Sequence, residues 1–154
     1  MRLYKVYHFG FGIHLAISII LMAPLSTKAQ GLAGYRWQNR LVLILAEDSS
    51  NPDFQEQVRA FQAAEEDLQD LRIVVFQALP QRYIRGTQQL PNWISGDQLY
   101  ESYKSRGSSF EFLLLGLDGD IKLRRHRVVT LDELYELINT MPMRRAELRR
   151  RGGG

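Results

Sequence analysis

Two stretches of consecutive apolar residues predict the interior strands of a β-sheet. Residues 112–115 (FLLL) and 41–46 (LVLILA) contain no polar side chain. A strand has this composition when both of its faces are covered by other parts of the protein. We therefore expect both segments to lie inside a sheet that has helices above and below it.

Apolar residues at helical spacing predict two longer helices, each with a start signal. One stripe follows Asn51, a favoured N-cap, and Pro52, which suits the first helical position. The other follows Thr130, which forms a capping-box pattern with Glu133. The apolar positions are 54, 58, 61, 64 and 68 in the first helix and 131, 134, 137, 138 and 141 in the second.

Three shorter patterns complete the set of predicted elements. Residues 72–79 are rich in β-branched side chains and predict a strand, and Leu99 lies in a predicted short helix. The pair Asp118-Gly119 favours a tight two-residue turn. Residues 121–124 then alternate between apolar and basic side chains, as on a strand with one face exposed to water.

These elements predict an α/β fold in the order strand, helix, strand, helix, hairpin, helix. Two crossovers and a hairpin give a mixed sheet with helices on both faces and a C-terminal β-hairpin and helix. This order resembles the thioredoxin fold over about residues 35–141. The resemblance implies a redox motif after the first strand and a cis-proline near Ser109, but the chain has no cysteine and no proline there. It therefore implies the fold without thiol-disulfide oxidoreductase activity.

A narrower resemblance concerns three segments and a distinctive closing motif, Met-Pro-Met-Arg-Arg. They are similar to a family catalogued as a domain of unknown function, DUF4174. That resemblance implies a small exported bacterial protein, related to domains of animal extracellular proteins with sushi repeats, and it implies no reaction. The segments are residues 35–46, 118–124 and 131–145.

Residues 1–29 have the pattern of a secretory signal peptide. Arg2 and Lys5 precede an apolar segment at residues 15–23, and Thr27 and Ala29 suit a cleavage site. The alternative is an uncleaved anchor that extends back through residues 9–13. Cleavage predicts an extracytoplasmic protein, periplasmic or secreted, without a membrane span. The mature chain then consists of a thioredoxin-like domain at residues 30–142 and a basic C-terminal tail at 143–154.

The net charge is no argument for a nucleic-acid partner, and we expect none. The formal net charge is +3, but three basic residues and no acidic residue lie in the predicted leader. Without them the chain has 17 basic and 17 acidic side chains, so the mature body is neutral. The absence of cysteine also excludes thiol chemistry and thiolate metal sites.

Carboxylates flank the predicted turn after the first strand. Glu47, Asp48 and Asp53 allow two interpretations, a weak Ca²⁺ or Mg²⁺ site and simple capping of the following helix. Their spacing matches no calcium loop, so we expect no metal and no cofactor. Ser109 and the same turn form the candidate site of a cysteine-independent enzyme. A serine nucleophile needs an adjacent base, and we expect His126 to lie away from the serines.

Two further features are candidates for partner binding. Arg144 and Arg145 begin an arginine-rich C-terminus that either adheres to an anionic surface or is a solvated terminus. Trp93 lies in residues 80–94, which lack a clear period and are predicted to form a long loop. We expect Trp37 to pack in the core. The hypothesis that best fits the sequence is an exported, non-catalytic binding or structural module, whose partner is an unknown protein or an anionic surface.

Overall fold

The computed structural model describes residues 32–87, 94–95 and 98–152. The predicted leader and Trp93 lie outside these residues. No helix in the described part of the chain is long and apolar enough to cross a membrane.

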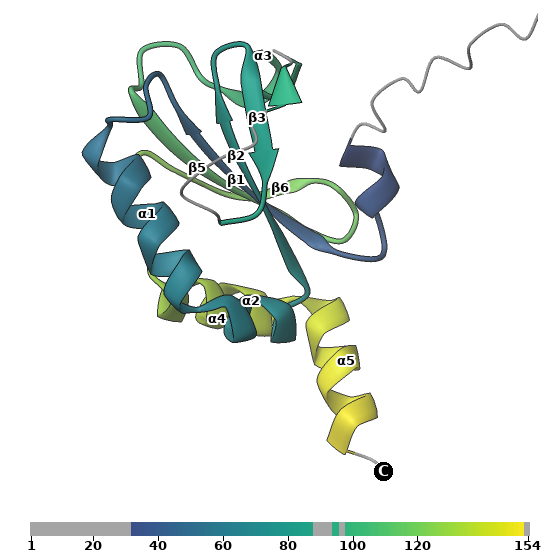
Figure 1. Cartoon of the computed structure of the whole chain (residues 1–154). Coiled ribbons are helices and arrows are strands. Elements are labelled where there is room, and N and C mark those ends of the chain that lie inside the picture. Colours follow the sequence, from purple (N-terminus) through teal and green to yellow (C-terminus); the bar gives the residue numbers. More distant parts are fainter. Residues whose placement is uncertain (1–31, 88–93, 96–97, 153–154) are drawn as a thin grey trace, which may run out of the picture.

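The domain is built on a six-stranded mixed sheet (Figure 1). The strands lie in the order β4-β3-β2-β1-β5-β6, and β1 and β2 are parallel while all other neighbours are antiparallel. This arrangement confirms the predicted mixed sheet with a C-terminal hairpin. The strands are β1 (Arg40–Ala46), β2 (Ile73–Leu79), β3 (Arg82–Arg85), β4 (Ile94–Ser95), β5 (Phe110–Leu115) and β6 (Ile121–Arg125).

The two apolar stretches lie in the sheet interior, as predicted. Every residue of β1 and of β5 is buried, and the two strands pair with each other, with Leu43 opposite Leu113. Alternate side chains of each strand point to opposite faces, so a strand with both faces covered contains apolar residues at every position.

Helices cover both faces of the sheet (Figure 1). On one face α1 (Pro52–Ala63), α2 (Glu65–Asp70) and α4 (Leu131–Thr140) pack their apolar stripes against β1, β2 and β5. On the other face the short 3₁₀ helix η1 (Leu32–Tyr35) and α3 (Gln98–Tyr103) cover a smaller cluster.

Both predicted N-caps are confirmed. The Asn51 side chain accepts a hydrogen bond from the Phe54 N–H at 3.0 Å, and the Thr130 hydroxyl accepts one from the Glu133 N–H at 3.2 Å. Each cap satisfies an amide that has no partner within its own helix. The long first helix is divided at Ala64 into α1 and α2.

The structure corrects two local predictions. Residues 82–85, expected to be loop, form β3, and Gln81 (φ 64°) turns the chain back from β2. Only Ile84 of β3 is fully buried, so this short strand, which lies between β2 and β4, has little apolar pattern. The connection between β5 and β6 spans five residues instead of two, with Gly119 (φ 85°) in the left-handed region.

Candidate functional site

The turn after β1 contains the predicted carboxylates and lies beside Ser109. The Glu47 N–H donates a hydrogen bond to the Ser109 carbonyl at 3.1 Å, and the Asn51 side-chain amide reaches the same oxygen at 3.5 Å. Two loops far apart in the sequence, one after β1 and one before β5, thus meet at this end of the sheet.

Asp48 and Asp53 stabilise the turn and the start of the helix that follows it. Asp48 accepts a hydrogen bond from the Ser50 N–H at 2.7 Å, and hydrogen bonds from Ser50 lower the pKa of the Asp48 carboxyl. Asp53 lies in the first turn of α1, where negative charge stabilises the helix end. No group of three or more carboxylates or imidazoles that could hold a metal ion occurs in the described residues.

His126 lies against a serine, contrary to the expected separation. Its Nδ1 is 3.0 Å from the Ser108 hydroxyl, because the end of β6 lies beside the loop that precedes β5. The Ser108 hydroxyl donates its single proton to the Phe110 carbonyl, which can only accept. His126 therefore faces Ser108 as a hydrogen-bond donor, which is the reverse of the role of a general base.

A buried carboxylate that sequence reasoning missed fixes the loop before β5. Glu111 is fully buried. Its carboxylate accepts hydrogen bonds from the N–H and the hydroxyl of Ser105, at 2.6 and 2.7 Å, and forms an ion pair with Arg124. Burial raises the pKa of Glu111, but these hydrogen bonds and the ion pair outweigh burial and hold the pKa below its ordinary value. Lys104 adds a hydrogen bond to the Ser105 carbonyl at 2.9 Å. These contacts hold the loop in place at several points.

At the opposite end of the sheet, the residues predicted as a basic tail form the helix α5 (Pro142–Gly152; Figure 1). Arg144 anchors it, because this side chain is 3% exposed and donates to the Asp70 carboxylate at 2.5 Å and to the Asp70 carbonyl at 3.0 Å. Arg144 is therefore engaged within the fold, whereas Arg145 is exposed.

A second buried cation joins α5 to the sheet. Arg40 is 1% exposed and donates to the Glu147 carboxylate at 3.3 and 3.4 Å and to the Leu71 carbonyl at 2.9 Å. Arg144 and Arg72 approach the same carboxylate to 3.5 and 3.6 Å. Glu147 thus balances charge that Arg40 brings into the interior.

Trp37 is exposed, which corrects the expectation that it packs in the core. Its side chain is 63% exposed, and its backbone adopts a left-handed conformation with φ 64°. The Trp37 N–H donates a 2.7 Å hydrogen bond to the Leu117 carbonyl, which ties this turn to the β5–β6 connection. The turn directs the indole away from the core that begins three residues later, at Arg40.

Trp37 forms one wall of an open groove of about 400 Å³. Apolar side chains from three parts of the fold contribute to it, and two arginines lie at its margin. We call this surface the Trp37 groove; its main lining residues are Trp37, Leu117, Pro142, Met143, Arg72 and Arg150.

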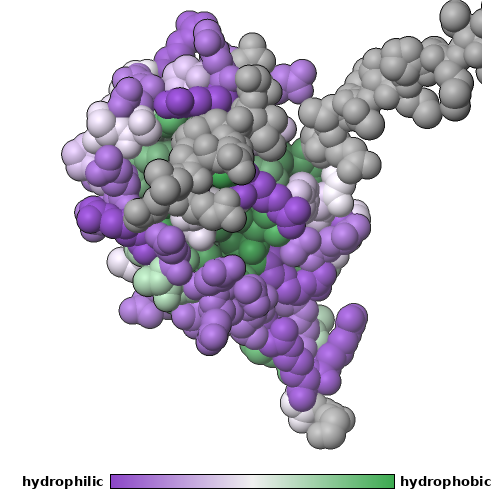
Figure 2. All heavy atoms as spheres, in the orientation of Figure 1, coloured by the Kyte–Doolittle hydropathy of each residue, from purple (hydrophilic) through white to green (hydrophobic). Residues whose placement is uncertain are grey.

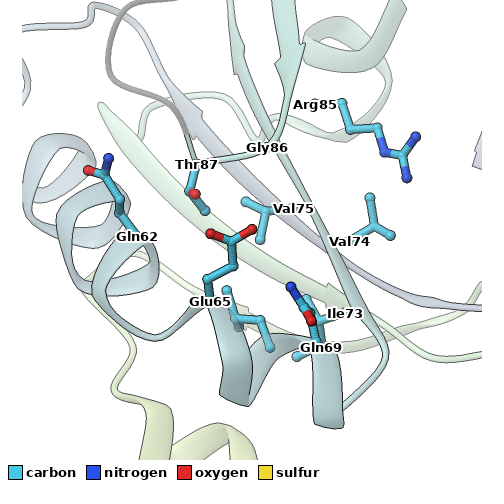
Figure 3. Close-up of a pocket in the computed structure, with 10 residues that line it drawn as sticks. Gln62, Glu65, Gln69, Ile73, Val74, Val75, Arg85, Gly86 and Thr87 are labelled. Carbon is cyan, nitrogen blue, oxygen red and sulfur yellow. The ribbon is translucent and has the colours of Figure 1, made fainter.

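A second hollow, of about 310 Å³, lies between α1–α2 and the β2–β3 edge (Figure 3). Ile73 and Val75 contribute apolar surface, while Gln62, Glu65 and Gln69 surround it with polar groups. In Figure 2 hydrophobic residues are visible in the middle of this face, among hydrophilic ones.

Comparison with known proteins identifies the family. The family model "Domain of unknown function (DUF4174)" matches residues 31–147. The chain belongs to this family. No curated protein matches it significantly. Among solved structures, the crystal structure of a reduced 2-Cys peroxiredoxin from Plasmodium vivax is similar, with a TM-score of 0.49 and 11% identity over 75% of this chain and 83% of that chain.

In this DUF4174 member, the three segments that carry the family resemblance meet at the Trp37 groove. Trp37 belongs to the first segment, Leu117 adjoins the second, and Met143 belongs to the third. Arg36 packs so closely on Gly119 that a Cβ at Gly119 would lie 2.6 Å from its Nε. One end of each segment therefore lies at the groove, and the Glu47 turn lies at the other end of β1.

Proposed function

We propose that this domain is an exported, non-catalytic binding or structural module with a thioredoxin-like fold. The observation that carries the proposal is the arrangement after β1, the position where the thioredoxin family keeps its redox motif. The chain has no cysteine, Asp48 and Asn51 accept hydrogen bonds from the backbone N–H groups of Ser50 and Phe54, and the Ser108 hydroxyl donates its proton to a carbonyl.

The Trp37 groove supports the binding role. An exposed tryptophan and a 42% exposed Met143 lie together beside arginines, and tryptophan and arginine are the residue types that most often dominate binding energy at interfaces. The hydrogen bond from the Trp37 N–H to the Leu117 carbonyl and the helix α5 fix the backbone around the groove, and a preformed surface loses little conformational entropy when a partner docks.

One observation favours the alternative of a cysteine-independent enzyme, namely the 3.0 Å contact between His126 and Ser108. We expect the purified chain to show only background turnover on ester, peptide, phosphate-ester and peroxide substrates. The variants His126→Ala, Ser108→Ala and Asp48→Ala should match the wild type within experimental error. Turnover that any of these variants abolishes would place a catalytic site here and contradict the proposal.

Export is tested separately, by N-terminal sequencing of the protein recovered outside the cytoplasm. We expect the chain to begin at Gln30, because Thr27 and Ala29 suit cleavage after Ala29. A variant Ala29→Arg, which places a large charged side chain at the cleavage position, should accumulate uncleaved. Recovery of a wild-type chain that begins at Met1 would contradict cleavage.

A further inference from the structure

We propose that the Trp37 groove binds an acidic segment of a partner protein and takes up an apolar side chain of that segment. This inference deepens the proposed function, because it rests on the domain being a binding module and names the class of partner. Shape, rigidity and charge of the groove each support it.

The groove has the shape and surface to hold a side chain. Its volume of about 400 Å³ falls within the range of ligand pockets, and Leu117, Pro142 and Met143 contribute apolar surface next to the indole of Trp37. Trp37 and Met143 are 63% and 42% exposed in the free domain. Covering them with an apolar side chain would remove this surface from water and contribute the main attraction.

The principal wall of the groove is set before a partner arrives. Trp37 has a left-handed backbone conformation, which is uncommon and costly for a residue other than glycine. The 2.7 Å hydrogen bond from its N–H to the Leu117 carbonyl holds this conformation. Because the indole is exposed, packing in the core does not account for this strained backbone. A role of Trp37 in contacting a partner does account for it.

The charge of the groove specifies an acidic partner. Arg150 makes no hydrogen bond or ion pair with the described residues, and Arg72 is 40% exposed at the same margin. The carboxylate at the groove, Glu147, is only 14% exposed and is already matched by Arg40, Arg72 and Arg144. The accessible charge is therefore positive and comes mainly from Arg150, because Arg72 shares the Glu147 carboxylate; it complements carboxylates that flank the inserted side chain.

Two other occupants fit the surface less well. A membrane favours a protruding apolar face, whereas this surface is concave, and α5 is mostly hydrophilic, with Met143 and Leu148 as its exposed large apolar residues. A second copy of the chain offers Ile121, which is 44% exposed beside Asp120. In that segment Lys122 already pairs with Asp118 at 2.6 Å and approaches Asp120 to 3.6 Å, so its charge is largely neutralised.

The test measures binding of a fluorescein-labelled peptide to the purified chain by fluorescence anisotropy. In the peptide, one phenylalanine is flanked on each side by three glutamates. We expect saturable binding that weakens as salt rises, and that weakens about tenfold or more with Trp37→Ala and with Arg150→Glu. Arg59→Glu makes the same charge change on an exposed face of α1 and should alter affinity less than about twofold.

Two control peptides separate the apolar from the charged contribution. Replacing phenylalanine by serine should weaken binding about as much as Trp37→Ala does, and replacing the glutamates by glutamines about as much as Arg150→Glu does. All three protein variants change exposed residues, so their thermal unfolding should match that of the wild type. The inference would be overturned if the serine peptide bound as tightly as the phenylalanine peptide, or if Trp37→Ala bound the peptide as tightly as the wild type.

Other results would identify a different occupant and also overturn it. A dimer detected by light scattering and dissolved by Trp37→Ala would assign the groove to a second copy. If the protein bound phosphatidylglycerol vesicles in a Trp37-dependent way and did not bind the peptide, the groove would be assigned to a membrane. Absence of peptide binding in a chain without turnover would reject this inference alone, whereas catalytic turnover would reject the proposed function itself.

Discussion

Replacing Glu147 by alanine should lower the free energy of unfolding by about 3–5 kcal/mol, the usual cost of leaving a buried charge without its partner. Arg40 is 1% exposed, and Glu147 is the carboxylate that it contacts, at 3.3 Å. Burial lowers the pKa of Arg40 and the Glu147 hydrogen bond offsets part of this effect, but arginine stays protonated at any ordinary pH. The variant must therefore keep an uncompensated cation inside or expose it by releasing α5.

Urea unfolding measures this loss, and amide hydrogen exchange shows whether α5 opens first. Glu136→Ala is the matched control, because Glu136 is an exposed glutamate on the neighbouring helix α4 and should change stability by less than about 0.5 kcal/mol. Removing both charges, with Arg40→Met and Glu147→Leu, should recover a large part of the loss. A Glu147→Ala protein as stable as the Glu136→Ala control would show that α5 does not depend on this ion pair.

The second large effect is expected at Glu111. Glu111→Ala should lower the free energy of unfolding by about 2–3 kcal/mol, because the Ser105 N–H and hydroxyl lose their acceptor and Arg124 loses its counter-ion. The value lies below that for Glu147, since Arg124 is 33% exposed and water partly solvates it. Glu101→Ala, an exposed glutamate on α3, is the control.

Glu111 also predicts part of the pH dependence of stability. Its pKa is held below the ordinary value of 4.5, so the folded state favours the ionised form. The stability that this preference contributes is complete above the ordinary pKa, which the unfolded chain has, and is lost as the pH falls from there through the folded pKa. Glu111→Gln should therefore be less stable at neutral pH and lose less stability on acidification. Parallel acid-unfolding curves for the two proteins would contradict this role.

Several features of the fold could be predicted because they depend on local pattern. The unbroken apolar composition of residues 41–46 and 112–115 required two covered faces, and both strands are buried in the sheet. Asn51 and Thr130 were recognisable as caps because their hydrogen bonds reach only three residues along the chain. By contrast, β3 escaped prediction because a four-residue strand with one buried residue has no clear alternation of apolar and polar residues.

The site was predictable only in part, because its contacts join distant segments. The carboxylate turn and Ser109 do meet, but the pairing of His126 with Ser108 depends on how β6 lies beside the loop before β5. Glu111 and Arg40 are each a single charged residue next to an apolar stretch, and this was the available sign that either of them is buried. Nothing local distinguishes such a residue from one that ends the strand in water.

By itself the sequence determined the covered sheet, the helix starts and the exclusion of sulfur chemistry, since each follows from residue type and short-range spacing. Only the tertiary structure decided that Arg40 is balanced by Glu147, 107 residues away, and that Trp37 is exposed beside Met143. The physical reason is that burial of a charge or an indole depends on which distant segments of the chain pack around it. A pattern of neighbouring residues does not contain this information.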